Sequence, residues 1–325
     1  MSQSSLIPES LILIRDIIMK TMNPLGLSLK SCASWCKRKC SEISSDTILY
    51  SGGLYSTMGI VEKTELFLKP IISNPTREAP VKLARPFMGI GSAFLPMFRN
   101  KKLERIPERA MDILERLGYN FCCLDEEPYS GALLYDLGFS RELRQYGKRL
   151  SEFFKERGVK KIIVMDPHTY ELFTEIYPKI IDKFDFEILN LVKILANEIK
   201  KGSIKLQSKR SMKVVYHDPC HYSKSSSDKI VNEPREIISA IENVVLEEPE
   251  NKEALSLCCG GPVEFVFLKL SEEIAKIRYK ELTATGADTI ITACPICAIN
   301  FRRVADGNTR VIDLVDLIYE SIVGG

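Results

Sequence analysis

The sequence lacks several features, and each absence excludes a class of function. It has 45 Lys and Arg residues against 43 Asp and Glu residues, so its formal net charge is only +2. Without an excess of positive charge, the chain has no electrostatic basis for binding nucleic acid. Histidine occurs only three times, and no Ser/His/Asp or Cys/His pairing stands out. We therefore predict no hydrolytic triad.

Long apolar runs and nucleotide-binding loops are missing as well. No stretch reaches the roughly 18 uncharged residues that a transmembrane helix requires. Charged residues interrupt the apolar segment 11–22, whose apolar side chains share one helical face, so we expect an amphipathic helix rather than a signal peptide. We expect it to pack on the protein, with docking to a partner or a membrane surface as the alternative. The glycine pairs Gly52–Gly53 and Gly89–Gly91 do not fit G-x-G-x-x-G, so no nucleotide site is predicted.

Cysteine, in contrast, is abundant. Ten cysteines in a chain without an export signal favour a reducing compartment, and hence a cytoplasmic location, where clustered thiols serve metal or redox chemistry more often than disulfides. Half of them lie in the C-terminal part of the chain in the order Cys, Cys-Cys-Gly-Gly, Cys-x-x-Cys. These are Cys220, Cys258, Cys259, Cys294 and Cys297.

This cysteine pattern favours an iron–sulfur cluster. Thiolates are soft ligands for iron–sulfur clusters and for zinc. Adjacent cysteines diverge too far to share one small ion, and five thiols exceed the four that zinc takes. Cys294 follows an apolar strand and opens a helix, whose N–H groups would stabilise thiolate charge. Gly260 and Gly261 would let the backbone approach a cluster. Zinc is the alternative.

The remaining pattern predicts an α/β fold. Runs rich in β-branched residues end in turns and pass into helical patterns, which indicates βα units with mainly parallel sheets. The predicted strands are residues 46–50, 161–165, 213–216 and 288–292.

Two segments share one arrangement, which predicts an internal repeat. Residues 258–297 run from Cys-Cys-Gly through a helix and a strand to Cys-Pro-Ile-Cys. Residues 129–169 run from Tyr-Ser-Gly through a helix and a strand to Asp-Pro-His-Thr. The first repeat is longer, and we expect an additional helical stretch within 57–100 and a linker near 200–210. The predicted organisation is an N-terminal helical segment (1–44), a first repeat (45–205) and a second repeat (206–325).

The cysteine order resembles the cysteine-rich CCG domain found in the B-type and D-type subunits of heterodisulfide reductase, in the C-type subunit of anaerobic glycerol-3-phosphate dehydrogenase, and in iron–sulfur subunits of lactate and glycolate oxidation. The segment Tyr216-His217-Asp218-Pro219-Cys220-His221 is also similar to the lead-in of that family. The resemblance implies a duplicated domain and a noncubane [4Fe-4S] cluster held by all five cysteines. In the first repeat the family's cysteine positions hold other residues, so a CCG domain without a cluster is expected there. Those residues are Gly53, Tyr129, Ser130, Asp166 and Thr169.

The resemblance further implies an electron-transfer subunit of a larger oxidoreductase. Its partners would be a flavoprotein dehydrogenase or ferredoxin-type iron–sulfur subunits, because the chain has no ferredoxin C-x2-C-x2-C-x3-C motif of its own. Membrane association would be peripheral and occur through a partner. One alternative is a catalytic subunit that reduces a disulfide at the cluster. Another is a scaffold or anchor subunit that holds zinc or no metal.

The histidines are secondary candidates. His217 and His221 would either hydrogen-bond to cluster sulfurs, and so tune the cluster's potential, or serve a structural role. His168 and Asp166 could together bind a hard or borderline metal ion, but two ligands make a weak site.

Five cysteines lie outside the C-terminal pattern. Cys32, Cys36 and Cys40 would lie along one side of a helix. We interpret them as reactive or incidental thiols near an interface, since C-x3-C-x3-C matches no ligand spacing that we can support for a second metal site. Cys122 and Cys123 end a short apolar run and are expected to pack in the core.

Overall fold

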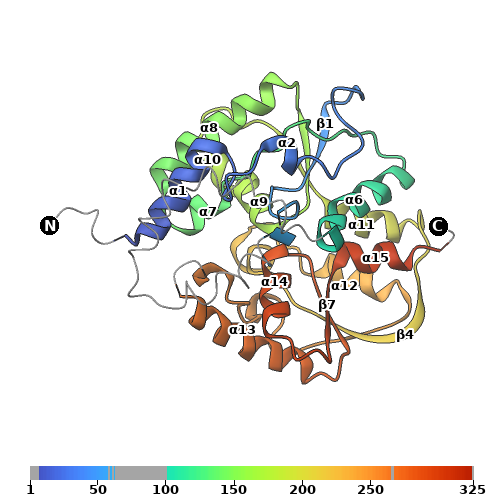
Figure 1. Cartoon of the computed structure of the whole chain (residues 1–325). Coiled ribbons are helices and arrows are strands. Elements are labelled where there is room, and N and C mark those ends of the chain that lie inside the picture. The colour runs from blue at the N-terminus through green and yellow to red at the C-terminus, as the bar shows by residue number, and fades with distance from the viewer. Residues whose placement is uncertain (1–6, 58, 61, 63–100, 265–266, 324–325) are drawn as a thin grey trace.

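Two parallel β-sheets organise the protein (Figure 1). The computed structural model describes residues 7–57, 59–60, 62, 101–264 and 267–323. The strand order is β1-β2-β3 in one sheet and β5-β4-β6-β7 in the other. Every pairing between these strands is parallel, which confirms the predicted α/β class with parallel sheets.

The elements of the N-terminal part, with short 3-10 or π helices labelled η, are α1 (Glu9–Thr21), α2 (Leu29–Cys32), β1 (Thr47–Tyr50), α6 (Lys101–Arg116), α7 (Ala132–Asp136), α8 (Ser140–Glu156), β2 (Lys161–Val164), α9 (Pro167–Glu171), η4 (Leu172–Ile176), α10 (Tyr177–Ile180), β3 (Glu187–Asn190) and α11 (Leu191–Lys200).

Those of the C-terminal part are β4 (Gln207–Tyr216), η5 (His221–Ser225), α12 (Asn232–Ser239), β5 (Glu242–Glu247), η6 (Glu253–Leu255), η7 (Gly261–Val263), α13 (Leu268–Thr283), β6 (Thr289–Thr292), α14 (Pro295–Val304), β7 (Arg310–Asp313) and α15 (Leu314–Ser321).

The central strands are buried, as expected for parallel sheets that helices cover on both faces. In β2 the last three residues are buried, and in β6 all four are. Ile48 of β1 pairs with Ile162 of β2, and Val215 of β4 pairs with Ile290 of β6. The apolar side chains of both sheets belong to one continuous core.

The strand predictions were correct for the central strands and incomplete at the edges. All four predicted strands are present, but β4 begins at Gln207, so the last part of the expected linker 200–210 is strand. The edge strands β3, β5 and β7 were not predicted, because their partly exposed residues lack a continuous apolar run. Most of the expected helical stretch in 57–100, including Gly89–Gly91, lies outside the described residues.

Helix α1 confirms the predicted amphipathic segment. Leu11 and Ile18 are buried, and the helix ends at Thr21, followed by the cap residue Met22 in a left-handed conformation. Arg149 of α8 donates a hydrogen bond to the carbonyl oxygen of Met19. The helix therefore packs on the protein. None of the described helices is both long and apolar enough to cross a membrane.

Two disulfides correct the interpretation of the N-terminal cysteines. Cys36 is bonded to Cys123, and Cys40 to Cys122. Of the three cysteines expected on one helix, only Cys32 lies in α2. The partners are more than 80 residues apart in the sequence. They meet because Lys39 pairs with Cys123, and Ile48 with Cys122, in isolated parallel bridges beside β1.

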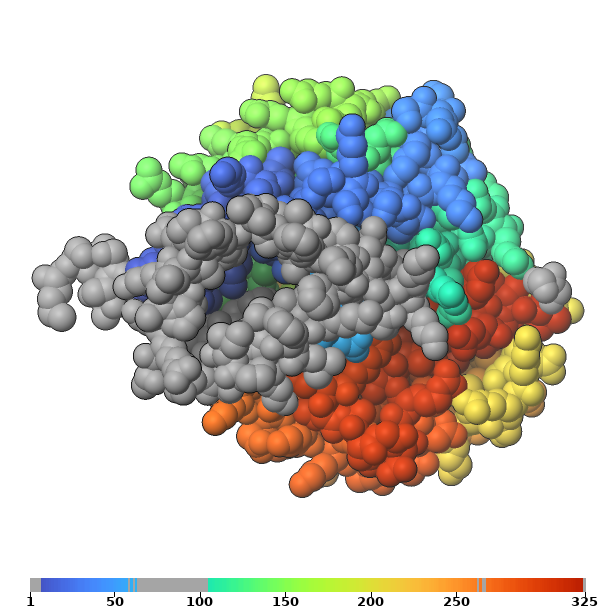
Figure 2. Space-filling view, in the orientation of Figure 1, coloured from blue at the N-terminus to red at the C-terminus, as the bar shows by residue number. Residues whose placement is uncertain are grey.

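The two sheets and their helices meet along an extensive boundary. Figure 2 shows the N-terminal part, in blue and green, above the C-terminal part, in orange and red. Tyr55 donates a hydrogen bond to Asp313 across this boundary at 2.8 Å, and Asn190 donates one to Tyr222 at 2.9 Å. These side chains are buried, so both parts contribute to one interior.

Candidate metal centre

The parallel sheet places the C-terminal cysteines at the carboxyl ends of neighbouring strands. Cys220 follows β4, and Cys294 follows β6, the strand paired with β4. Cys294 is the N-cap of α14, and Cys297 lies in the first turn of that helix, as predicted. Because parallel strands end at one edge of a sheet, residues far apart in sequence meet there.

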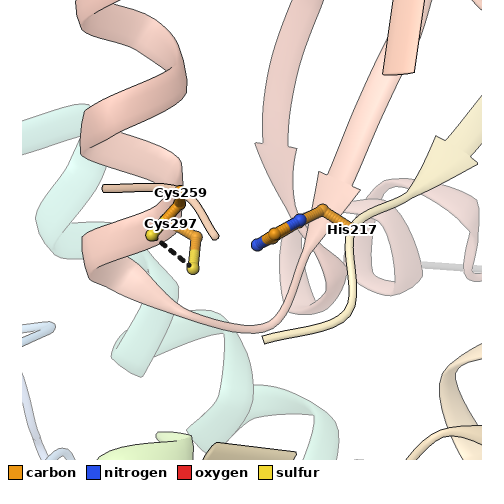
Figure 3. A group of neighbouring side chains, drawn as sticks. All are labelled: His217, Cys259 and Cys297. Atoms are coloured by element: carbon orange, nitrogen blue, oxygen red, sulfur yellow. Dashed lines mark hydrogen bonds between the residues drawn. The ribbon is translucent and has the colours of Figure 1, made fainter. Parts of the chain in front are cut away.

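The sulfur atoms form one group. The Sγ atoms of Cys297 and Cys259 lie 3.3 Å apart (Figure 3). The thiols of Cys294 and Cys297 affect each other's pKa, and so do those of Cys258 and Cys259. Cys220 interacts electrostatically with Cys259 and Cys294. The structure thus brings all five predicted cysteines together, with Cys258 exposed and Cys220 partly exposed.

The electrostatics of this group call for a positive charge. Burial raises the pKa of Cys220 to about 11. Burial also raises the pKa of Cys297. The interaction with Cys259 raises the pKa of Cys258. Hydrogen bonds from Cys258 and Cys297 lower the pKa of Cys259. The five thiols cannot all ionise together unless a cation compensates their repulsion, and iron in a cluster or zinc would do so.

Gly260 and Gly261, which follow the cysteine pair, allow close packing of the surrounding chain. Gly260 has φ +86°, and a Cβ there would overlap the carbonyl oxygen of Ser271. A Cβ on Gly261 would lie 2.5 Å from Cγ2 of Ile296 and 3.5 Å from Sγ of Cys259. Their absent side chains therefore allow close approach to α13 and α14. The approach of this backbone to a cluster stays a prediction.

His217 points its ring toward the sulfurs of Cys259 and Cys297 (Figure 3). Arg278, which is fully buried, donates from Nε to Nδ1 of His217 at 3.2 Å. Arginine is only a donor, so Nδ1 must be the unprotonated nitrogen of a neutral ring. Nε2 then carries the proton and faces the sulfur of Cys259, because ligand atoms of the two side chains lie within 4.8 Å of each other. His217 is thereby suited to donate to a thiolate and not to ligate a metal itself.

Of the two roles left open for His221, its contacts in the structure fit the structural one. Its Nδ1 hydrogen-bonds to Glu171 of α9, and its Nε2 lies 3.9 Å from Oδ1 of Asp136. The histidine beside a sulfur is instead His168, whose Nε2 lies 3.6 Å from Sγ of Cys294. Sequence reasoning missed this contact because the two residues belong to different sheets.

Several of the residues that we predicted at the cysteine positions of a first repeat carry side-chain oxygen atoms. Asp166 caps α9 by accepting a hydrogen bond from the Thr169 N–H at 2.9 Å. Oδ2 of Asp166, Oγ1 of Thr169 and Oγ of Ser130 are buried without a hydrogen-bond partner in the described structure. Gly52 lies beside them, and a Cβ on it would overlap Asp166 and Thr169. Such hard oxygen donors do not suit an iron–sulfur cluster.

A narrow cavity lies between the N-terminal and the C-terminal part of the protein. Its volume is about 30 Å³, enough for about one water molecule. Gly261 and Ile296 line it from the C-terminal part, and Tyr129, Asp136 and His168 line it from the N-terminal part.

Comparison with known proteins identifies the segment that carries these cysteines. The family model for the cysteine-rich domain, CCG, matches residues 214–302. Residues 214–302 are a CCG domain. This CCG domain contains all five C-terminal cysteines together with His217 and Arg278, and it confirms the resemblance that the cysteine order indicated.

The sequence similarity between this chain and known proteins extends beyond the CCG domain. The probable iron-sulfur-binding oxidoreductase FadF of Bacillus subtilis is 27% identical over 220 residues, which are 65% of this chain and 31% of FadF. The D-type subunit of the dihydromethanophenazine:CoB–CoM heterodisulfide reductase of Methanosarcina mazei is 28% identical over 221 residues, 65% of this chain and 52% of that protein. Lactate utilization protein A of Halalkalibacterium halodurans is 23% identical over 208 residues, 60% of this chain and 81% of that protein. The chain thus spans about a third of FadF and about half of the reductase protein.

Arg278, near the cysteines of the CCG domain, was not predicted from sequence. In α13, Arg278 pairs with Glu281 three residues later, a spacing typical of a solvated surface pair. The structure buries it completely. Only the fold reveals its contact with His217, which lies 61 residues earlier.

Proposed function

We propose that this chain is an iron–sulfur electron-transfer subunit of an oxidoreductase of the heterodisulfide reductase or flavin dehydrogenase type, the latter acting on lactate or glycerol-3-phosphate. The observation that carries the proposal is the convergence of the five cysteines within the CCG domain. In this proposal Cys220, Cys258, Cys259, Cys294 and Cys297 hold a noncubane [4Fe-4S] cluster. When bound, the cluster supplies one-electron chemistry, and the protein sets its potential.

The two sheets support the proposal of a duplicated fold. The order β1-β2-β3 parallels β4-β6-β7, and the segment at Cys122 lies beside β1 as β5 lies beside β4. Asp166 caps α9 after β2 in the way that Cys294 begins α14 after β6. The proposed domains are 1–44, a cluster-free CCG-type domain at 45–205, and a cluster-binding domain at 206–325.

The exposed side of the cysteine group is suited to electron exchange with a partner. Cys258 is exposed, and its neighbours Leu255 and Leu257 are 72% and 37% exposed. An apolar rim around an exposed ligand suits contact with another protein, because its burial in an interface is favourable. The partner in this proposal is a flavoprotein dehydrogenase or a ferredoxin-type iron–sulfur subunit.

Hydrogen bonds from the CCG domain would tune the potential. His217 directs its ring at Cys259, and Asn300 places Nδ2 3.9 Å from the same sulfur. Donors to cluster sulfurs stabilise the more negative, reduced state. The buried Arg278 is a positioning residue in this scheme, since it acts on the sulfur only through His217.

Metal analysis after anaerobic purification tests the proposal. Iron, sulfide and zinc would be measured together with EPR spectra for the wild type and for Cys258→Ser/Cys259→Ser. Cys32→Ser is the matched control, because Cys32 is also a reduced, buried cysteine but lies outside the CCG domain. We expect about four irons per chain in the wild type and the control, and loss of iron in the double variant. About one zinc per chain, or no metal, would instead indicate a scaffold.

A further inference from the structure

A second group of potential ligands lies beside the cysteines. Asp136 ends α7, His168 lies in α9, and His221 begins η5. One ligand atom from each of these three lies within 4.8 Å of those from the other two. Side-chain exposure is 16% for Asp136, 8% for His168 and 9% for His221, so little water reaches the group. This group of three residues connects the two parts of the protein, since Asp136 and His168 come from the N-terminal part and His221 from the C-terminal part.

The outer contacts of the two histidines determine which nitrogen faces inward. Glu171, itself buried, bonds to Nδ1 of His221 and holds the proton on that nitrogen, which leaves a lone pair on Nε2. On His168, Nε2 lies against the sulfur of Cys294, so a neutral ring that donates there keeps its lone pair on Nδ1. A carboxylate that orients a histidine through its other nitrogen is the usual arrangement behind a metal ligand.

Both inward nitrogens face the same carboxylate. Oδ2 of Asp136 lies 3.5 Å from Nδ1 of His168, and its Oδ1 lies 3.9 Å from Nε2 of His221. Both distances exceed those of ordinary N–H···O hydrogen bonds. They are close to the separation of two ligands that share one ion at about 2 Å. Three acceptors directed at one another require a cation or a proton between them.

We propose that Asp136, His168 and His221 bind a divalent first-row transition metal ion, such as Zn²⁺ or Fe²⁺, next to the cysteine group. Two imidazoles and a carboxylate are borderline ligands that suit these ions and not Mg²⁺ or Ca²⁺. Glu171 orients His221 from behind. Because Asp136 and His168 also line the narrow cavity, a small ligand there would reach a coordination position that the protein leaves open.

A proton is the competing occupant. Burial lowers the pKa of His168, but its interactions with Asp136 and Cys294 outweigh this effect and hold the pKa well above its ordinary value. A protonated His168 would satisfy Asp136 on one side. It would leave the 3.9 Å gap between Asp136 and His221 unexplained.

Titration of the full chain with Co²⁺, a spectroscopic substitute for zinc, tests the site. The chain would carry its reconstituted iron–sulfur cluster, and iron and sulfide would be determined for every sample. We expect about one Co²⁺ per chain with visible ligand-field bands and without sulfur-to-cobalt charge transfer. Cobalt bound to cysteines would show that charge transfer, so the two sites are distinguishable. Iron and sulfide content reports on the cluster independently of the cobalt result.

Two variants decide between the occupants. Asp136→Asn should abolish Co²⁺ binding, and Glu171→Gln should weaken it by roughly 10- to 100-fold, because a Gln amide can reverse the tautomer of His221. Asp182→Asn, a change at an exposed carboxylate, is the matched control and should bind as the wild type does. Absence of Co²⁺ binding in the wild type, or unchanged binding in Asp136→Asn, would overturn the proposal in favour of a protonated His168.

Discussion

Arg278 donates a hydrogen bond to Nδ1 of His217 and thereby directs the protonated nitrogen of that ring at Cys259. Arg278 is fully buried, and it also contacts Ser256, Glu281 and the carbonyl oxygen of Asn251. The guanidinium is therefore held in place from several sides. This arrangement leads to the first prediction.

Replacing Arg278 with Met should lower the reduction potential of the bound cluster. Without the guanidinium, His217 can place its proton on either nitrogen, and the hydrogen bond to Cys259 weakens. We expect a shift of roughly tens of millivolts to more negative potential, measured by EPR-monitored redox titration. Lys276→Met, at a half-exposed position of the same helix, is the control. An unchanged potential in Arg278→Met would mean that His217 does not act on the sulfur.

Replacing Gly260 with Ala should destabilise the CCG domain more than the same change at Gly286. Both glycines have positive φ, +86° and +78°, so both substitutions strain the backbone. Only at Gly260 would the new Cβ meet another group, the carbonyl oxygen of Ser271. We expect a loss of about 1 kcal/mol for Gly286→Ala and of about 3 kcal/mol for Gly260→Ala in denaturant unfolding. Equal losses would show that the close approach of α13 is unimportant.

Removing Arg235 should destabilise the fold through Asp218. The Asp218 side chain is completely buried, and Arg235 contacts it at 2.7 and 2.9 Å. Arg235→Met leaves that carboxylate without its cation, and we expect a loss of about 3 kcal/mol in the free energy of unfolding. Asp218→Asn/Arg235→Met removes both charges and should be less destabilised than Arg235→Met alone. A double variant that is as unstable as the single one would contradict this account.

Stability should fall as the pH rises toward neutrality, partly because of Asp313. Burial raises the pKa of Asp313 to about 7, above its unfolded value of about 3.9. Between these pH values the folded chain binds more protons than the unfolded chain, so the free energy of unfolding decreases as the pH rises. Burial raises the pKa of Glu127 to about 7 as well.

Asp313→Asn therefore should make this pH dependence shallower. Urea unfolding between about pH 5 and about pH 8 would measure it, with Asp288→Asn as the control at a carboxylate outside the boundary. A slope as steep in Asp313→Asn as in the wild type would show that Asp313 is ionised in the folded chain.

Thiol counting tests the two N-terminal disulfides. Six cysteines are reduced, and the chain has ten. The denatured chain should therefore titrate six thiols after removal of iron, and ten after reduction. Ten thiols without reductant would support the original expectation that Cys36, Cys40, Cys122 and Cys123 are unpaired.

The sequence was most informative where the contacts are short in range or where an apolar run is continuous. Strands β2 and β6 are buried on both faces, so their composition alone marks them. The placement of Cys294 at a helix N-terminus followed from the strand and proline around it. Cys36 and Cys123 could not be paired from sequence, since only the strand arrangement beside β1 brings them together.

The histidines show the same limit at the candidate site. From sequence, His168 could be paired only with Asp166, its near neighbour, in a weak site, but Asp166 caps α9 and the carboxylate that His168 faces is Asp136. The sequence left two roles open for His221, a bond to the sulfurs and a structural one, and only the structure shows its bond to Glu171. Each of these contacts joins residues from separate elements, and no spacing in the sequence records them.

The most direct test of the central claim is the iron and acid-labile sulfide content, with EPR spectra, of five single Cys→Ser variants at Cys220, Cys258, Cys259, Cys294 and Cys297, prepared anaerobically beside Cys32→Ser. We predict that each of the five loses iron or changes its EPR spectrum, whereas Cys32→Ser matches the wild type at about four irons per chain. Full iron content and an unchanged spectrum in any one of the five would contradict a cluster held by all five cysteines.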